Sequence, residues 1–132
     1  MPSEERKVGL INENKFYPCP EKHVCVSTQA PKDDEKHYMK PLSYDGSIQD
    51  AKKKILKIIN SKSRTKILKN EENYLHVLFT TFLLRFKDDV EFYFDDENKL
   101  IHFRSQSRIG GYDWGKNRSR MEEIREYYEN LK

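Results

Sequence analysis

The stretch KDDVEFYFDDENKLIHFR, residues 87–104, decides the fold of this chain. Apolar side chains alternate with polar ones in two parts of it, at Val90, Phe92, Phe94, Ile101 and Phe103. Alternation with a period of two places these side chains on one face of a β-strand. Residues 95–98 between the two parts are polar and favour a turn, so we expect two antiparallel neighbours that share a core face.

The preceding residues predict two more strands, one at 64–69 and a longer one at 73–86, followed by a turn at Lys87-Asp88-Asp89. In the longer strand the apolar parity changes after Phe79. A bulge at Thr80-Thr81 reconciles the two halves, because one extra residue shifts the alternation by one. A straight strand with both faces covered is the alternative. The expected core contains Leu75, Val77, Phe79, Phe82, Leu84, Val90, Phe92, Ile101 and Phe103.

Helical spacing appears on either side of the four strands. In residues 47–60 isoleucines and an alanine recur every three or four positions, opposite lysines, after a serine that suits an N-cap. Residues 121–131 show a second apolar stripe of this kind. Ser119 and Glu122 form a capping-box pattern before it, and Asn117 is the alternative N-cap.

Residues 1–46 show no clear periodicity and hold both cysteines together with Pro18, Pro20, Pro31 and Pro41. Proline blocks helix continuation and cannot donate to a sheet, so we expect an extended N-terminal arm packed on the domain. Residues 47–132 then form an α-β-β-β-β-α core, and 132 residues suit one domain overall. The predicted fold class is α+β, with two layers: two helices on one face of a mainly antiparallel four-stranded sheet.

The composition excludes some function classes. The 25 basic and 22 acidic residues leave a net charge of +3, which does not indicate a nucleic-acid binder. No apolar run approaches the roughly 18 residues of a membrane helix. The start MPSEERK also lacks the apolar stretch of a signal peptide. We therefore expect a soluble protein without a transmembrane segment or a signal peptide in the chain as given.

The densest polar passage is RSQSRIGGYDWGKNRSR, residues 104–120, called the terminal signature below. If the strand continues past Arg104, then His102, Gln106 and Arg108 share its face, opposite the core. Arginine forks, the amides of a glycine loop and a helix N-terminus are the ingredients of an anion site. The candidate ligand-binding residues are Arg104, Ser105, Ser107, Arg108, Gly110, Asp113, Asn117, Arg118 and Arg120.

The glycines should turn the chain tightly after the last strand, and this should bring Arg104 and Arg108 near residues 117–120 at the helix start. The alternative is that these arginines pair internally with acidic residues, because arginine readily pins a loop through two hydrogen bonds. Asp88 and Asp89 are the structural anchors expected in that case, with Asp113 and Glu91 as further partners.

The terminal signature resembles the pattern RSxSRxGxxDxGxNRxR of a family known as domain of unknown function fourteen-ninety-nine (DUF1499). Three other stretches are similar to that family: CPEKHVCVSTQA to its CPxxxNCVSSQA opening, MKPLSY to its Pro-Leu segment, and RFKDDVEFYF to its Asp-Asp-Val-Glu-Phe strand. The likeness spans about residues 18 to 126 and departs from the pattern at Val24 and Thr28. It implies no reaction. Members often carry export signals to bacterial envelopes or plastids, and this chain shows none.

Cys19 and Cys25 lie six residues apart and allow three interpretations. They can close a small disulfide loop, remain two buried thiols, or ligate a metal with His23. A structural zinc site needs four ligands, and only His37 is left nearby as the fourth. We expect the two cysteines to be structural and within disulfide reach, and we expect no metal and no cofactor.

The leading functional hypothesis is a small, non-enzymatic module that binds an anionic group or a protein partner through its arginine-rich loop and sheet face. One alternative is an accessory subunit of a larger assembly, in which the arginine cluster is an internal clasp. The other is a hydrolase-like enzyme in which His102, the candidate catalytic residue, acts as a base while Arg104 and Arg108 hold an anionic substrate. The sequence names neither ligand nor partner.

Overall fold

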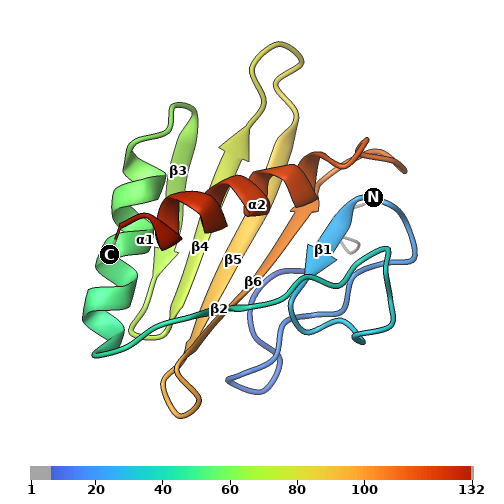
Figure 1. The fold of residues 1–132 in the computed structure, drawn as a ribbon. Helices are drawn as coiled ribbons and strands as arrows, with labels where there is room; N and C mark the ends of the chain where they lie inside the picture. The colour runs from blue at the N-terminus through green and yellow to red at the C-terminus, as the bar shows by residue number, and fades with distance from the viewer. Residues whose placement is uncertain (1–6, 132) are drawn as a thin grey trace.

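The computed structural model describes residues 7–131, so the sequence interpretation of residues 1–6 lies outside this range. Its elements are β1 (Cys25–Ser27), β2 (Leu42–Ser43), α1 (Ile48–Asn60), β3 (Thr65–Asn70), β4 (Tyr74–Thr80), β5 (Lys87–Asp95), β6 (Leu100–Ser107) and α2 (Lys116–Glu129). The strands form one antiparallel sheet in the order β1-β6-β5-β4-β3 (Figure 1), and β2 also pairs with β6. The α+β class and the antiparallel neighbours are confirmed.

The sheet has more strands than the four expected, because two short parts of the N-terminal arm pair with β6. In β1, Val26 lies opposite Ser105, and in β2, Leu42 lies opposite Ile101. Without these strands β6 would form an open edge with unpaired backbone groups. The arm therefore completes the sheet as well as packing on it.

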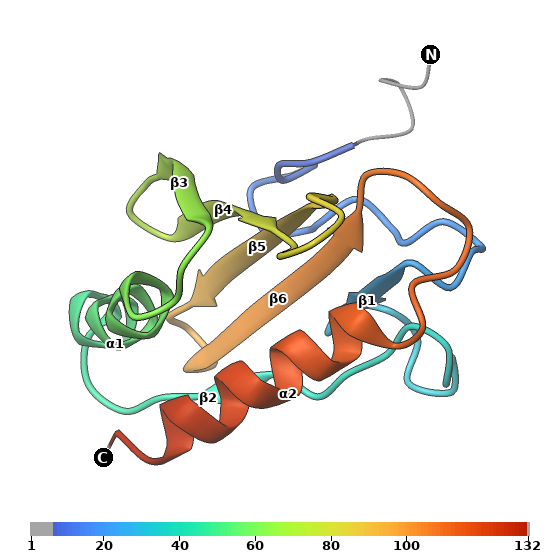
Figure 2. The same cartoon turned by 90° about the horizontal axis from the view of Figure 1, so that it is seen from above.

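One apolar core lies between the sheet and both helices (Figure 2). The sheet supplies alternate residues of β4, β5 and β6 to this core, as the period-two pattern predicts. The helices contribute Ala51, Ile55, Ile58, Ile59, Met121, Ile124 and Tyr128, and the arm contributes Val26, Met39, Leu42 and Tyr44. Both helices therefore cover the same sheet face.

The two helices begin differently. Ser47 caps α1, and its side chain accepts a hydrogen bond of 3.1 Å from the backbone N–H of Asp50. Gly115 precedes α2 in the left-handed region, with φ 76°, and makes no side-chain cap. The predicted capping box at Ser119 is wrong, and Asn117 lies inside the helix, because the chain becomes helical at Lys116 already.

The segment 81–86 corrects the sequence interpretation. It is the turn between β4 and β5, closed by a hydrogen bond from Thr81 N to Phe86 O, so there is no bulge at Thr80-Thr81. Phe82 and Leu84 are 63% and 70% exposed and do not belong to the core. The change of apolar parity after Phe79 therefore marks the end of β4. The predicted turn at 87–89 is also wrong, because these residues are the first three of β5.

The sheet face away from the helices is covered in part by the N-terminal arm (Figure 2). Gly9 and Pro18 of the arm hydrogen-bond to side chains of β5 and β6. The arm is also tied to β1 by the disulfide between Cys19 and Cys25, whose Cα atoms lie 5.6 Å apart. Within residues 7–131, neither helix combines the length and apolar character needed to cross a bilayer.

Candidate functional site

The two adjacent carboxylates at the start of β5 point to opposite faces of the sheet. Asp88 shares the parity of the core residue Val90 and faces α2, whereas Asp89 shares the parity of Glu91 and faces away. Both are buried, with exposed fractions of 1% and 2%. Each acid is therefore the centre of a separate ionic cluster, and the sheet lies between them.

On the helix side, Arg120 binds Asp88. The Nη2 atom of Arg120 lies 2.5 Å from Asp88 Oδ2, and Nη1 donates to Ser105 Oγ at 3.1 Å and to Asn117 Oδ1 at 2.9 Å. The guanidinium also lies over the ring of Phe79, 4.9 Å from its centroid. These contacts fix the first half of α2 against the sheet.

Asn117 is completely buried and joins three parts of the chain. Its Nδ2 donates to Val24 O at 3.1 Å, to Ser107 Oγ at 3.0 Å and to Asp113 Oδ2 at 2.6 Å, and its Oδ1 accepts from Ser105 Oγ at 2.6 Å. Five of the residues that were expected to bind a ligand thus bind one another, namely Ser105, Ser107, Asp113, Asn117 and Arg120. We call these contacts, with those of Arg120, the helix-side clasp.

On the other face, Glu91 and Arg104 form a buried ion pair. The Nη1 atom of Arg104 lies 3.2 Å from Glu91 Oε2, and Nη2 donates to Pro18 O at 3.2 Å. Glu91 Oε1 accepts from Tyr74 Oη at 2.6 Å and from Gly9 N at 2.8 Å. Burial lowers the pKa of Arg104, and the charge of Glu91 and its hydrogen bond oppose that change.

Asp89 forms the second ion pair of this face. Arg108 donates to it from Nε at 2.9 Å and from Nη2 at 3.1 Å, and His76 Nε2 lies 2.8 Å from its Oδ1. Burial alone would raise the pKa of Asp89, but the hydrogen bonds from His76 and Arg108 outweigh it and lower the pKa to about 2. Arg108 is therefore engaged by a carboxylate of its own chain.

The expected convergence of Arg104 and Arg108 with residues 117–120 is wrong. The parity argument placed both arginines correctly on the sheet face opposite the core, but α2 packs on the core face, so the sheet separates the two groups. Arg118 points elsewhere and donates to the carbonyl oxygens of residues 35, 36 and 38. Gly110, with φ 95°, lies in the exposed loop before α2.

His102 lies apart from the arginines with which an enzyme mechanism would combine it. Its Nδ1 is 2.8 Å from Thr28 Oγ1, its ring stacks on Tyr93, and burial lowers its pKa. It lines a cleft of about 790 Å³ beside the N-terminal arm, and among the described residues neither Arg104 nor Arg108 lines that cleft. The described residues also contain no cluster of three or more histidines, cysteines or carboxylates suited to a metal.

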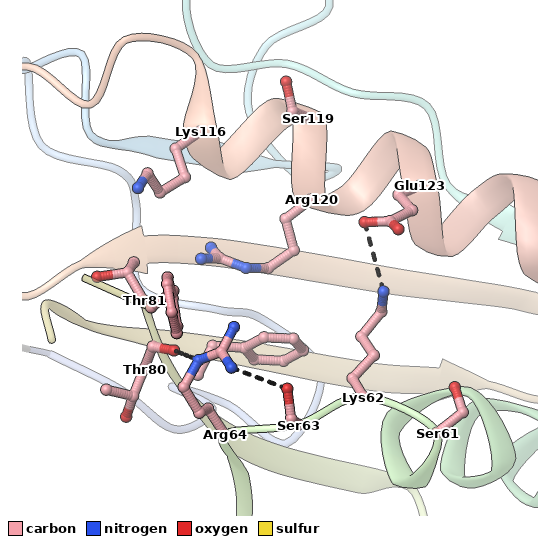
Figure 3. Close-up of a pocket in the computed structure, with 12 residues that line it drawn as sticks. Ser61, Lys62, Ser63, Arg64, Thr80, Thr81, Lys116, Ser119, Arg120 and Glu123 are labelled. Atoms are coloured by element: carbon pink, nitrogen blue, oxygen red, sulfur yellow. Dashed lines mark hydrogen bonds and ion pairs between the residues drawn. The ribbon is translucent and has the colours of Figure 1, made fainter. Parts of the chain in front are cut away.

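A basic cleft of about 560 Å³ opens between the α1–β3 loop, the end of β4 and the first half of α2 (Figure 3). Its lining includes four cationic side chains, which are Lys62, Arg64, Lys116 and Arg120. Glu123 is the only carboxylate among its described lining residues. Only Arg120 of these four was among the expected binding residues. Lys62 and Arg64 lie in the loop between α1 and β3, and Lys116 is the first residue of α2, so no periodic pattern links them.

The cations of the basic cleft differ in how they are paired. Lys62 Nζ lies 3.4 Å from Glu123 Oε1, and Arg120 forms an ion pair with Asp88. Among the described residues, the hydrogen-bond partners of Arg64 are neutral oxygens, Thr80 O at 3.2 Å and a neighbouring serine hydroxyl (Figure 3). Within residues 7–131, neither Arg64 nor Lys116 has a carboxylate partner. The cleft therefore carries an excess of positive charge.

The family comparison agrees with the resemblance of the terminal signature. The model of the family described as "Protein of unknown function (DUF1499)" matches residues 15–127, a range that includes the disulfide loop, the whole sheet and most of α2. No curated protein matches the chain. The chain belongs to the DUF1499 family.

Proposed function

We propose that this protein is a small, non-enzymatic module that binds an anionic group in the basic cleft. The observation that carries the proposal is the pair Arg64 and Lys116, two exposed cations that line one cleft without a carboxylate partner among the described residues. An anion bound in the cleft compensates the excess positive charge that these two cations leave there.

The terminal signature supports this proposal indirectly. Arg104, Arg108 and Arg120 are engaged by Glu91, Asp89 and Asp88, and these ion pairs support a positioning role for the three arginines. The helix-side clasp instead fixes the first turns of α2 beside the end of β4. Walls that are fixed before binding lose little conformational entropy when a ligand arrives. In this proposal most of the signature positions the walls of the cleft, and Lys116, which is also part of the signature, contacts the anion.

The donor set suits a phosphate- or sulfate-type oxyanion. Arg64 can offer two parallel N–H donors to two oxygens, and Lys116 offers a point charge. Hydroxyl groups of Ser63 and Thr81 also line the cleft and can donate further hydrogen bonds. A singly charged carboxylate would leave part of this positive charge uncompensated, so a doubly charged oxyanion should bind more tightly.

A hydrolase-like role has weaker support. It requires His102 to act beside Arg104 and Arg108, and those arginines are engaged outside the cleft that His102 lines. An accessory subunit remains compatible with the clasp, because the same contacts stiffen the fold whether or not an anion binds. Binding of an anion in the basic cleft separates that account from the proposal.

Calorimetric titration with inorganic phosphate tests the proposal. We expect the wild type to bind, and we expect Arg64→Ala and Lys116→Ala each to weaken binding by at least about fivefold, the order expected for a charged hydrogen bond. Lys53→Ala is the matched control, because Lys53 is an exposed lysine of α1 outside the cleft. Absence of binding by the wild type, or an equal loss in Lys53→Ala, would contradict the proposal.

A further inference from the structure

The turn between β4 and β5 presents large apolar side chains to solvent. Phe82, Leu83 and Leu84, called the apolar tip, are 63%, 79% and 70% exposed. Figure 1 shows this turn projecting beyond the end of β6. Contiguous exposed apolar side chains are uncommon on a monomer and mark an interaction site. The tip therefore calls for a partner that accepts apolar groups.

The surroundings of the tip are basic. Arg85 and Lys87 are exposed within and beside the same turn, and Arg64 lies over the ring of Phe82, 5.2 Å from its centroid. The acids that follow in sequence, residues 88 and 89, are buried and bound to arginines. Phe82 also lines the basic cleft, so the apolar tip and the cleft form one continuous surface.

The loop before α2 adds apolar side chains at the same end of the sheet. Arg108, the first residue after β6, donates from its backbone N–H to Lys87 O at 3.0 Å, which places the loop before α2 beside the start of β5. In this loop Ile109 is 63% exposed and Trp114 is 86% exposed. Tryptophan suits the boundary between water and hydrocarbon, because its ring is amphipathic.

We propose that this end of the sheet docks on an anionic phospholipid bilayer, with the apolar tip inserted among the acyl chains and a lipid phosphate in the basic cleft. This inference rests on the proposed function, and it identifies the bound oxyanion as the phosphate of a lipid headgroup. Two features favour a bilayer over a protein partner. The tip is a convex projection of three side chains, too small for the roughly 800 Å² per partner of a stable protein interface. The charged residues beside the tip, Arg64, Arg85 and Lys87, are basic, which matches an anionic membrane surface.

Vesicle sedimentation tests the docking. We expect the wild type to bind vesicles of equal parts phosphatidylcholine and phosphatidylglycerol and to bind pure phosphatidylcholine at least about tenfold more weakly, because surface charge supplies part of the attraction. Leu83→Ser should weaken binding to the mixed vesicles by about tenfold, from the loss of one inserted aliphatic side chain. Ile11→Ser, which changes an exposed aliphatic residue in the N-terminal arm, is the matched control and should not alter it.

Calorimetry with inorganic phosphate on the same variants separates this inference from the proposed function. Leu83→Ser should bind phosphate like the wild type, because Leu83 does not line the cleft. Phosphate binding without vesicle binding would overturn the membrane inference and leave the proposed function standing. Vesicle binding that Leu83→Ser leaves unchanged, or that pure phosphatidylcholine supports equally, would also overturn it. A third outcome is that the wild type binds vesicles but not phosphate, and that Arg64→Ala binds vesicles as well as the wild type does. This outcome would contradict both the proposed function and the lipid-phosphate contact.

Discussion

Glu91 and Arg104 occupy the same register position on β5 and β6 and form an ion pair whose side chains are 0% and 2% exposed. The pair lies on the sheet face away from the helices, beneath residues 9 and 18 of the arm. This face therefore has a polar interior, in contrast to the apolar core on the helix side. A buried ion pair is costly to break from one side only, because the remaining charge is left without a partner.

Arg104→Met should lower the free energy of unfolding by about 3 to 5 kcal/mol, because it leaves Glu91 buried and charged. The double variant Arg104→Met, Glu91→Gln should recover part of this loss, since the neutral amide still accepts hydrogen bonds from Tyr74 and Gly9. Urea unfolding of the two variants measures both values. A loss below about 1 kcal/mol in Arg104→Met would contradict the importance of the pair.

Asp89 should make the protein sensitive to acid. Its pKa is about 2 in the folded state, against 3.8 for an unperturbed aspartate, so its stabilising contribution is complete above the unfolded value. That contribution, about 2 kcal/mol, is lost as the pH falls from 3.8 through about 2, because the proton then displaces the hydrogen bonds from Arg108 and His76. Unfolding free energies measured across this range should show less pH dependence in Asp89→Asn than in the wild type. Equal dependence would exclude Asp89 as the source.

Asn117→Ala should destabilise the protein by about 2 to 3 kcal/mol, because it removes several buried hydrogen bonds at once and leaves their partners unsatisfied. Asn60→Ala is the control, since Asn60 is exposed at the end of α1 and should change stability by no more than about 0.5 kcal/mol. Thermal melts of the two variants give the comparison. Similar melting temperatures would argue against the helix-side clasp.

The same substitution at two phenylalanines, Phe92→Ala and Phe82→Ala, tests which of them belongs to the core. Phe92 is 1% exposed, so its truncation should cost about 3 to 5 kcal/mol, whereas Phe82 is 63% exposed and should cost less than about 1 kcal/mol. Denaturant unfolding distinguishes the two positions. A large loss in Phe82→Ala would restore the bulged-strand interpretation of residues 73–86.

Short-range sequence patterns correctly predicted the strands and the helix start that depend on neighbouring residues. The period-two alternation around Phe92 and Phe103 fixed two strands and their core face, and Ser47 marked the start of α1. The apolar residues of segment 81–86 misled the same reasoning, because a hydrophobic turn has the composition of a strand. The strands β1 and β2 have three and two residues, too few for any periodicity, and form because the edge of β6 needs partners.

The candidate site was harder to predict than the fold. Alternation placed Arg104 and Arg108 on the face opposite the core, but it contains no information about which face α2 covers. The cations Arg64 and Lys116 are 52 positions apart, and only the packing of α2 beside the α1–β3 loop brings them to one cleft. Such tertiary proximity leaves no signal in one sequence.

The most direct test of the account is a phosphate titration of the ¹⁵N-labelled protein followed by NMR. We expect saturable shifts at the backbone amides of Ser63, Thr81 and Arg120, which line the basic cleft, and none at Glu91 or Gln106 on the other sheet face. Shifts centred on Glu91 and Gln106, or no saturable shifts anywhere, would contradict the claim that the terminal signature builds the cleft and that the cleft binds the anion.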